Sequence, residues 1–387
     1  MKIVIAPDSF KESLTAKQVC DAVEKGFSEV FPQAQYVHLP LADGGEGTVD
    51  VLLQGLDGEV RCSLVSGPLG SHHEEAKISA QWALLDNGNT ALIEVAAASG
   101  LDLIDVSKRD PTVTTTYGTG ELIREALDLD VSKIMLGLGG SATNDGGAGI
   151  LQALGGKLLD RKGNELPKGG AALADLVRID LSQIHPRCKD VEFIVACDVA
   201  NPLIGLNGAS QVFGPQKGAS QSLVTELDQS LAHFAKVSKT AIGIDHSFSS
   251  GFGAAGGTPL GLSLMFDVQI KPGIEMILDA LDADKVLEQA DLVITGEGQM
   301  DNQTLEGKTP FGIAKRAKAK SIPVIGIAGS LGSEIDDLYA TIDSAFASVR
   351  SPQSLEQVLQ EASMNVTRTS RNIAATLKLG ASMINTK

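Results

Sequence analysis

Apolar residues near the start of the chain repeat first at strand spacing and then at helix spacing. A short buried strand is predicted over residues 2–6, where an apolar run from residue 3 ends in a Pro-Asp-Ser turn. Thr15 and Gln18 have the spacing of a helix capping box, and apolar residues recur every three or four positions after them. A second strand is predicted over 36–41 and a second helix over 49–56. This alternation of strand and helix predicts the start of a parallel sheet.

The pattern changes near residue 60, where apolar and polar residues begin to alternate. Alternation over 60–64 and 76–84, then a turn-forming stretch and an apolar run over 90–95, predicts antiparallel strands with one solvated face. Buried strands are predicted further along, over 134–138 and 193–197. A second kind of domain therefore begins near residue 60, although the strand over 134–138 fits either domain.

The parallel rhythm returns from about residue 290. Strands are predicted over 292–295, 322–327 and 344–349, with a helix over 310–318 whose first residue is a proline. Helices are predicted to follow to the C-terminus.

Together these patterns predict a two-domain α/β fold. One domain is a discontinuous, Rossmann-like parallel sheet built from residues 1–60 and 290–387. The other is a mixed α/β domain over 61–289, inserted into the first. The length of 387 residues agrees with more than one core, and 43% hydrophobic residues are enough to fill both.

The net charge of −16 narrows the classes of partner. It argues against nucleic acid, which requires a basic face, and equally against an anionic membrane surface. It does not exclude a phosphorylated small molecule, because amides, a few lysines and a metal ion can hold phosphate locally.

Cysteine spacing and hydropathy point to a protein that stays in the cytoplasm. The four cysteines have no CxxC spacing and are predicted to be reduced and packed. No apolar run approaches the ~20 residues of a membrane span, and the apolar stretch at the N-terminus is too short for a signal peptide. A homo-oligomer is compatible with the sequence, which does not fix the oligomeric state.

Polar, glycine-rich segments stand where apolar strands end. Ligands of open α/β sheets bind outside the carboxyl ends of the strands, so we expect these segments to form one site. The five segments cover residues 8–11, 43–47, 139–147, 198–201 and 295–301.

Two of these segments have the chemistry of a phosphate site. The segment 139–147 offers successive amides at a helix start, an arrangement that binds phosphate, and carries more polar side chains than a packing turn needs. Asp43 and Glu46, three residues apart among glycines, could hold a Mg²⁺–phosphate group. An ordinary turn and a solvated acidic loop are the alternatives for the two segments.

Single residues add candidates for anchoring and proton transfer. Lys11 and Lys308 could anchor a phosphate or carboxylate, although each could equally be a solvated surface lysine. Asp198 follows a buried strand directly and could accept the proton of a substrate hydroxyl. Lys217 is a weaker candidate.

One nucleotide-binding pattern offers a different interpretation. Residues 137–142 match the GxGxxA fingerprint of dinucleotide-binding domains after a predicted strand, with Asp160 about twenty residues on. The polar residues that follow the fingerprint argue against it, because a Rossmann helix would pack apolar residues there. Gly251–Gly256 matches GxGxxG without a preceding strand, and Gly307–Thr309 lacks the first glycine of a P-loop.

Seven segments, in the same order from end to end, resemble the type-1 glycerate kinases of bacteria. They are residues 6–15, 41–48, 116–123, 139–149, 196–203, 213–219 and 295–304. The resemblance implies two α/β domains with the site in the cleft between them, ATP and Mg²⁺ as co-substrates, and phosphoglycerate as product. Similar bacterial members generally give 2-phosphoglycerate, whereas some of the wider group phosphorylate the 3-hydroxyl.

We therefore expect an ATP-dependent phosphorylation of D-glycerate by in-line phosphoryl transfer. Lys11 or Lys308 would hold the glycerate carboxylate, and Asp198 or Asp301 would take the hydroxyl proton. The further predicted contacts are Asp8, Ser9 and Asn201 for the substrate, Gly139, Gly140, Ser141, Asn144, Asp145 and Gly147 for the nucleotide, and Asp43, Glu46 and Glu297 for Mg²⁺.

Two other classes of protein stay open as alternatives. An NAD-dependent dehydrogenase would use the fingerprint at 137–142, and a two-lobed solute-binding protein would bind its ligand without turnover. The first would bind reduced cofactor, and the second would normally carry an export signal.

Overall fold

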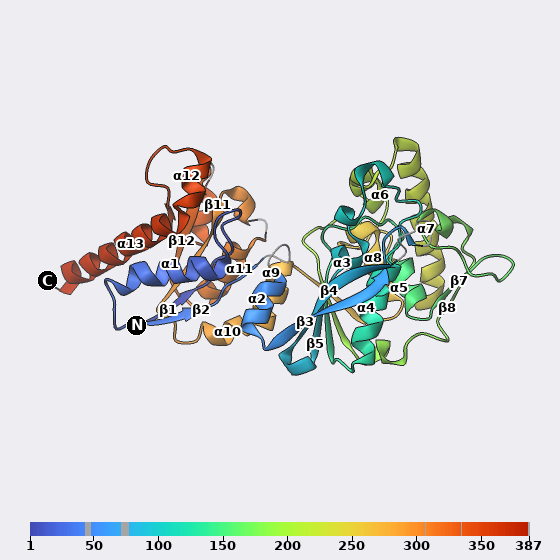
Figure 1. Cartoon of the computed structure of the whole chain (residues 1–387), viewed down its shortest axis with the longest axis horizontal. Coiled ribbons are helices and arrows are strands. Elements are labelled where there is room, and N and C mark those ends of the chain that lie inside the picture. Colours follow the sequence, from blue (N-terminus) through green and yellow to red (C-terminus); the bar gives the residue numbers. More distant parts are fainter. Residues whose placement is uncertain (43–47, 71–76, 306, 334, 386–387) are drawn as a thin grey trace. The chain divides into compact units, whose positions relative to one another are not determined.

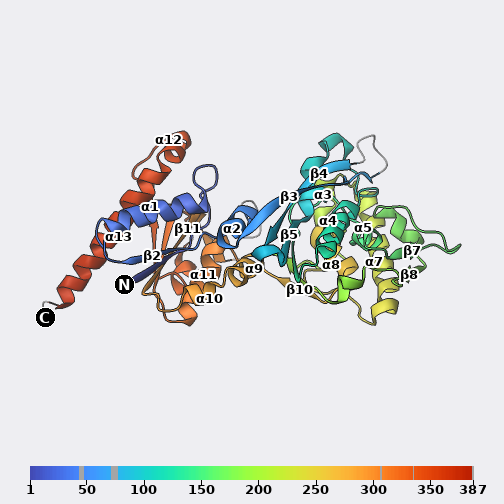
Figure 2. The ribbon, with the colours of Figure 1, turned by 60° about the horizontal axis from the view of Figure 1, so that its bottom comes forward.

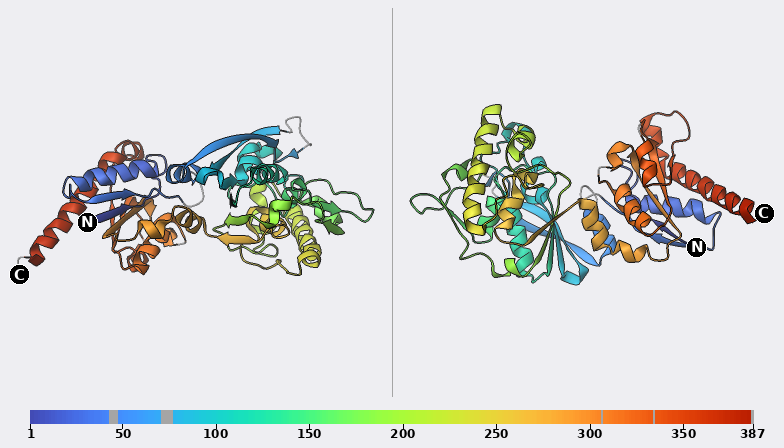
Figure 3. Two further views of the ribbon diagram at one scale, coloured as in Figure 1. Left: turned by 90° about the horizontal axis from the view of Figure 1, so that it is seen from below. Right: turned by 180° about the vertical axis from the view of Figure 1, so that it is seen from behind.

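The structure is a computed structural model that describes residues 1–42, 48–70, 77–305, 307–333 and 335–385. Its contacts divide the chain into two compact units. Unit 1 comprises Met1–Gly55 and Pro272–Lys387, and unit 2 comprises Leu56–Lys271. The crossings between the units thus lie near residues 55 and 272, where the sequence predicted boundaries near 60 and 290. Figure 3 shows that both chain termini belong to unit 1.

Unit 1 is built on an all-parallel sheet, as the alternation of strands and helices predicts. The strands lie in the order β13 (Ser344–Ala347), β12 (Val324–Leu331), β11 (Leu292–Met300), β1 (Lys2–Ile5) and β2 (Gln35–His38). The helices of this unit are α1 (Ala16–Ser28), α2 (Thr48–Gly55), α9 (Gly273–Ala280), α10 (Ala283–Val286), α11 (Thr309–Ala319), α12 (Leu355–Gln360) and α13 (Ala362–Asn385).

Helices cover both faces of this sheet. In Figures 1 and 2, α1 and α13 lie side by side on one face and α11 lies on the other. Ile3 and Ile5 of β1 pack in one buried cluster with Phe27 of α1 and Ile373 of α13. A parallel strand between two helical layers is buried on both sides, which is why residues 3–5 of β1 are all apolar.

Helix α1 begins where the sequence predicts. The Thr15 hydroxyl accepts a hydrogen bond from the Gln18 amide at 3.2 Å, and the Gln18 side chain accepts one from the Thr15 amide at 2.9 Å. This capping box satisfies amides that have no partner within the helix.

Unit 2 is built on a mixed sheet, in which antiparallel strands extend one side of a parallel set. The strands lie in the order β10 (Val268–Lys271), β9 (Glu192–Ala196), β6 (Lys133–Gly137), β5 (Thr90–Glu94), β4 (Lys77–Leu85) and β3 (Gly58–Ser66). Strands β3, β4 and β5 pair antiparallel, as predicted, and β5 pairs parallel with β6 on its other side. The strand that sequence could not assign, β6, lies inside this sheet.

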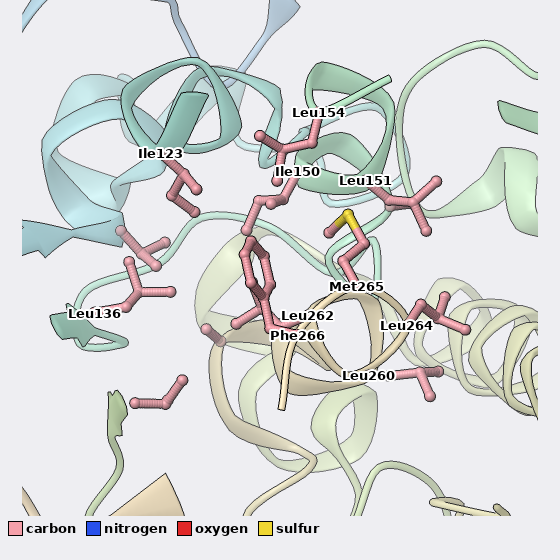
Figure 4. Close-up of a cluster of buried hydrophobic side chains, with 14 of the residues drawn as sticks. Ile123, Leu136, Ile150, Leu151, Leu154, Leu260, Leu262, Leu264, Met265 and Phe266 are labelled. Atoms are coloured by element: carbon pink, nitrogen blue, oxygen red, sulfur yellow. The ribbon is translucent and has the colours of Figure 1, made fainter. Parts of the chain in front are cut away.

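Helices and a small hairpin complete unit 2. The hairpin pairs β7 (Lys157–Leu159) with β8 (Arg178–Asp180), and the helices are α3 (Val95–Ser99), α4 (Tyr117–Asp128), α5 (Ala148–Ala153), α6 (Ala209–Phe213), α7 (Gln221–Ile242) and α8 (Thr258–Ser263). Figure 4 shows part of the core, where Ile123 of α4, Leu136 of β6 and Ile150 of α5 converge. Phe266 lies in the same cluster, its ring centroid 4.3 Å from that of Phe193.

None of the helices in the described part of the chain combines the length and the apolar character that a membrane span needs.

Candidate active site

The carboxyl ends of β1 and β11 lie next to each other in the sheet of unit 1. From β1 the chain proceeds to β2 on one side, and from β11 it proceeds to β12 on the other. The order of strands therefore reverses between β1 and β11, and such a switch point opens a crevice where α/β proteins bind ligands. Two of the predicted segments, 8–11 and 295–301, lie here.

A pocket of about 570 Å³ occupies this edge of the sheet. Its lining includes Asp8 and Lys11 after β1, Glu297 of β11, Lys308 before α11, and residues of α12 and α13. A second pocket of about 500 Å³ shares residues 8–13 with the first and continues toward α2. The size suits a small-molecule ligand.

Asp8 and Glu297 bring two carboxylates together in the first pocket. The Thr309 hydroxyl donates to Asp8 Oδ2 at 2.7 Å, and the Ser9 amide donates to Asp8 Oδ1 at 2.6 Å. The Thr304 hydroxyl donates to Glu297 Oε1 at 2.7 Å, and Lys308 Nζ lies 3.6 Å from Glu297 Oε2. Neighbours on several sides thus fix both carboxylates in place.

Electrostatics at Glu297 favour binding of a cation. Burial raises the pKa of this carboxyl and Asp8 raises it further, whereas Thr304 and Lys308 oppose the rise. A raised pKa means that the negative charge is under-compensated in the free protein. A bound cation would relieve that cost.

Mg²⁺ fits this carboxylate pair. Magnesium is usually held by one or two carboxylates together with phosphate oxygens and water, and Asp8 and Glu297 offer such a pair. The described residues hold no group of three or more metal-ligating side chains. Of the predicted ligands, Asp43 and Glu46 lie outside the described residues.

The other predicted residues of unit 1 take different positions around the pocket. Lys11 is exposed and lines both pockets, and Ser9 lines them beside it. Asp301 lies at the end of β11, where its amide donates to the Thr304 hydroxyl at 3.1 Å. Because that hydroxyl donates to Glu297, Asp301 is linked to the carboxylate pair through Thr304.

A second set of predicted residues gathers at the edge of the sheet in unit 2. Glu94, Gly137 and Ala196 stand in register at the ends of β5, β6 and β9. The segment 139–147 follows β6, and the exposed Asp198 follows β9. Asn201 donates from its side chain to the Asn207 carbonyl at 2.8 Å and so helps to shape its own loop. Glu94 was missed from sequence; burial raises the pKa of its carboxyl.

The segment 139–147 divides into an outer and an inner part. Gly139 and Gly140 are exposed, and among the described residues no acceptor is bonded to their amides or to that of Ser141. Asn144 and Asp145 are fully buried. The outer part can therefore present amides to an anion, whereas the inner part is used within the fold.

Asp145 performs a structural task in the inner part. Its carboxylate accepts from the amide and hydroxyl of Thr116 at 2.8 and 2.9 Å, and from the amides of Gly147 and Gly149 at 3.1 and 3.2 Å. These donors stand at the starts of α4 and α5, so one carboxylate caps two helices. The Asn144 side chain donates to the Ser210 hydroxyl at 2.9 Å.

Lys217 lies behind the segment and is only 2% exposed. Its Nζ donates to the Ser141 hydroxyl at 3.0 Å and to the Thr143 carbonyl at 2.7 Å. Burial lowers the pKa of this ammonium to about 7, against the opposing attraction of Asp145. The sequence ranked this lysine as weak, because nothing in the pattern around it signals burial.

The contact with Lys217 orients the Ser141 hydroxyl. The protonated Lys217 only donates hydrogen bonds, so Ser141 Oγ then accepts this one and its own hydrogen is available for another partner. Together with the amides of residues 139–141, it forms a set of donors at the edge of the sheet, with the buried Lys217 side chain behind them.

The geometry does not support a dinucleotide fingerprint at 137–142. A Rossmann fingerprint needs a helix that begins within the glycine motif, but here α5 begins at Ala148. Asp160 forms a surface turn in which its carboxylate accepts from the amides of Lys162 and Asn164. It belongs to the small hairpin region and not to the strand next to β6.

The sequence matches known proteins over nearly its whole length. A model of the glycerate kinase family matches residues 3–378. A glycerate 2-kinase of Escherichia coli strain K12 is 51% identical over 381 residues, which cover 98% of this chain and 99% of that protein. A glycerate kinase of Bacillus subtilis strain 168 is 49% identical over 384 residues, 99% of each chain.

A solved structure agrees with the fold. The crystal structure of a Salmonella typhimurium LT2 protein, described as a candidate glycerate kinase 2, superimposes with a TM-score of 0.89 at 48% identity. The match covers 99% of each chain. The resemblance on which the sequence interpretation rested is thereby confirmed, and the chain is an enzyme that belongs to the glycerate kinase family.

Proposed function

We propose that this enzyme transfers the γ-phosphoryl group of ATP to the 2-hydroxyl of D-glycerate, giving 2-phospho-D-glycerate and ADP. The observation that carries the proposal is the pocket at the switch point of unit 1, where Asp8 and Glu297 stand beside Lys11 and Lys308. Two carboxylates for a metal ion and two lysines for anionic substrates suit a phosphoryl transfer. The name of the Escherichia coli relative supports the 2-hydroxyl as acceptor.

Transfer of a phosphoryl group needs positioning and charge neutralisation more than covalent chemistry from the protein. Asp8 and Glu297 would hold Mg²⁺, with Asp43 and Glu46 as further predicted ligands. The ion supplies neutralisation of the charge on the transferred phosphoryl group. Lys11 or Lys308 binds the glycerate carboxylate, and the remaining lysine stays near the phosphates.

The edge of unit 2 supplies further contacts in this proposal. The amides of Gly139, Gly140 and Ser141, with the Ser141 hydroxyl, bind phosphate oxygens. Nucleotide contacts were predicted for Asn144, Asp145 and Gly147. In this proposal the three residues support the loop instead, because Asn144 is hydrogen-bonded to Ser210 and Asp145 accepts from Thr116 and Gly147.

Asp198 is the proposed general base. An aspartate just beyond a parallel strand, exposed and next to the amide-rich segment, can accept the proton of the glycerate hydroxyl. Asp301 is the alternative base in unit 1, where its link through Thr304 ties it to the carboxylate pair.

A coupled assay tests the proposal. Purified protein is incubated with D-glycerate, ATP and Mg²⁺, and enolase is then added. Direct conversion by enolase identifies 2-phosphoglycerate, whereas conversion only after a mutase is added identifies the 3-isomer. Absence of ADP formation in the presence of D-glycerate would overturn the proposal.

A further inference from the structure

The pocket in unit 1 changes character along the edge of the sheet. Its charged residues belong to the ends of β1 and β11, and its lining continues past β12 to residues that follow β13. Three strand spacings separate β1 from β13, a distance of about 14 Å at ~4.8 Å each. An elongated ligand can therefore lie along this edge with one end among charges.

The lining near β13 is apolar. Val349 follows β13, Leu355, Val358 and Leu359 belong to α12, and Ala362 begins α13. We call this part of the pocket the apolar lobe. Transfer of an apolar or aromatic group from water into a lobe of this composition has a favourable free energy.

Two side-chain amides in the lining of this lobe have buried polar atoms that are not hydrogen-bonded to any described residue. Asn365 of α13 is 1% exposed, and neither its Nδ2 nor its Oδ1 is bonded to any described residue. Gln353 donates from Nε2 to Glu361 Oε2 at 3.1 Å, but its Oε1 is buried without a partner. A buried amide left unpaired costs the protein stability, so retaining it indicates a partner in the functional state.

The chemistry of the missing partner can be deduced from these groups. A ligand that suits these groups has an apolar body for the lobe and an edge that carries a donor beside an acceptor, because a side-chain amide offers one of each. Adenine has that edge, in N6–H₂ next to a ring nitrogen, and asparagine pairs with it through two hydrogen bonds. Guanine carries an acceptor, O6, beside a donor, N1–H, in the reverse order, so the two bases require opposite orientations of the amide.

We propose that the apolar lobe is the adenine subsite of this enzyme, with the Asn365 amide reading the N6 edge of the base. This inference rests on the proposed use of ATP. The phosphates then run along the sheet edge toward Lys11, Lys308 and Glu297. The two amide atoms are covered in the free protein, so we expect the base to enter with a small shift of α12, whose Leu355 is 68% exposed.

The proposal makes base specificity depend on one residue. Asn365→Leu keeps the volume but removes both hydrogen bonds to adenine. Asn365→Asp offers two acceptors, which suit the N1–H and N2–H₂ donors of guanine and repel the acceptor of adenine. Loss of a bidentate pair corresponds to a change of about 10- to 100-fold.

The experiment measures the KM for ATP and GTP, and the kcat, of the full-length protein and its variants with D-glycerate. We expect Asn365→Leu to raise the KM for ATP about 10- to 100-fold with little change in kcat, and Asn365→Asp to raise the KM for ATP relative to the KM for GTP. Ser370→Ala is the matched control, since it removes a buried hydroxyl of α13 that has no partner among the described residues but lies outside this pocket. The exposed Leu355→Glu, which leaves the core intact, should raise the KM for ATP several-fold.

The outcomes separate this inference from the proposed function. If Asn365→Leu and Leu355→Glu leave the KM for ATP within twofold of the wild type, the adenine subsite lies elsewhere. If the Asn365 variants do not fold, Leu355→Glu alone decides. ADP binding to the wild type is measured by calorimetry in parallel. Tight binding of ADP over GDP without any phosphorylation of glycerate would overturn the proposed function while supporting the subsite.

Discussion

Lys217 gives a prediction that needs no substrate. Its ammonium is buried behind residues 139–147, and burial lowers its pKa from 10.5 to about 7. In the unfolded chain the same lysine keeps its proton up to about pH 10.5. Between these values the unfolded state binds more protons than the folded state, so the free energy of unfolding must rise with pH.

The size of this effect follows from the two pKa values. Each pH unit within the window contributes up to ~1.4 kcal/mol, so the whole window is worth on the order of 5 kcal/mol. From pH 7.5 to 9.5 the expected gain is about 2–3 kcal/mol, because the folded lysine still carries some protons at the lower end. The sign is opposite to that of a lysine that gains a carboxylate partner on folding.

Comparison with Lys217→Met isolates this contribution from all other titrating groups. Urea unfolding is followed at pH 7.5, 8.5 and 9.5 through Trp82, the only tryptophan in the sequence, which is buried in β4 and so reports on unit 2. We expect the difference in free energy of unfolding between wild type and variant to shift by about 2–3 kcal/mol in favour of the wild type over this range. Lys236→Met, at an exposed lysine of α7, serves as the control and should show no such trend.

A difference between wild type and Lys217→Met that stays constant with pH would refute the reasoning. It would mean that Lys217 keeps its proton in the folded protein, and that water or Asp145 compensates its charge more fully than the buried contacts indicate. The hydrogen bonds from Lys217 to Ser141 and Thr143 would then be enough to explain why a lysine occupies this buried position.

Three further substitutions test other parts of the structure. Glu297→Gln should raise the Mg²⁺ concentration for half-maximal activity by about tenfold or more, and an unchanged requirement would remove Glu297 from the metal site. Asp198→Asn should lower kcat by ~10²–10⁴ if this carboxylate is the general base, so near-normal turnover would shift that role to Asp301. Asp145→Ala should lower the free energy of unfolding by about 3–5 kcal/mol in the Trp82 transition, because buried donors at two helix starts lose their acceptor. A loss below about 1 kcal/mol would show that these helices do not depend on it.

Local signals in the sequence predicted most of the fold. The capping box at Thr15 and the apolar run before Pro7 act over a few residues, so their structural meaning does not depend on distant packing. The strands of unit 1 begin within two residues of the predicted starts for the same reason. Strands β11 and β12 continue beyond the predicted ends, to Met300 and Leu331, so most of the predicted polar segment 295–301 lies inside β11. Local signals do not reveal which strands pair. Only the structure places β6 in its sheet, because a buried strand has the same sequence pattern in either domain.

The boundary predicted near residue 290 shows where local signals fail. Helices α9 and α10 belong to unit 1, although they precede the strand with which the parallel rhythm returns. An amphipathic helix reveals that one of its faces is buried but not which sheet buries it. The second crossing therefore lies near Pro272, where no composition change marks it.

The candidate site was predictable where polar residues follow strands and not where polar residues are buried. Asp8, Glu297 and the glycines after β6 stand out in the sequence, because polar residues directly after an apolar run are visible as such. Lys217 and Asn365 do not stand out, since a lysine or asparagine among polar neighbours has the pattern of a solvated surface. Only the structure shows that both are buried, at 2% and 1% exposure.

The strand order of the two sheets suggests why Lys217 and Asn365 serve different parts of the ligand. Strand order reverses between β1 and β11 in unit 1, which opens a crevice long enough for a nucleotide. In unit 2, strands β5, β6, β9 and β10 follow one another in chain order, so no such reversal occurs among them. That edge instead offers a short row of amides with a buried lysine behind it. Such a row suits a small anion and makes no contact that distinguishes one base from another. Changes at Asn365 should therefore act on the choice of nucleotide alone, whereas changes at Lys217 should act on anion binding whichever nucleotide is supplied.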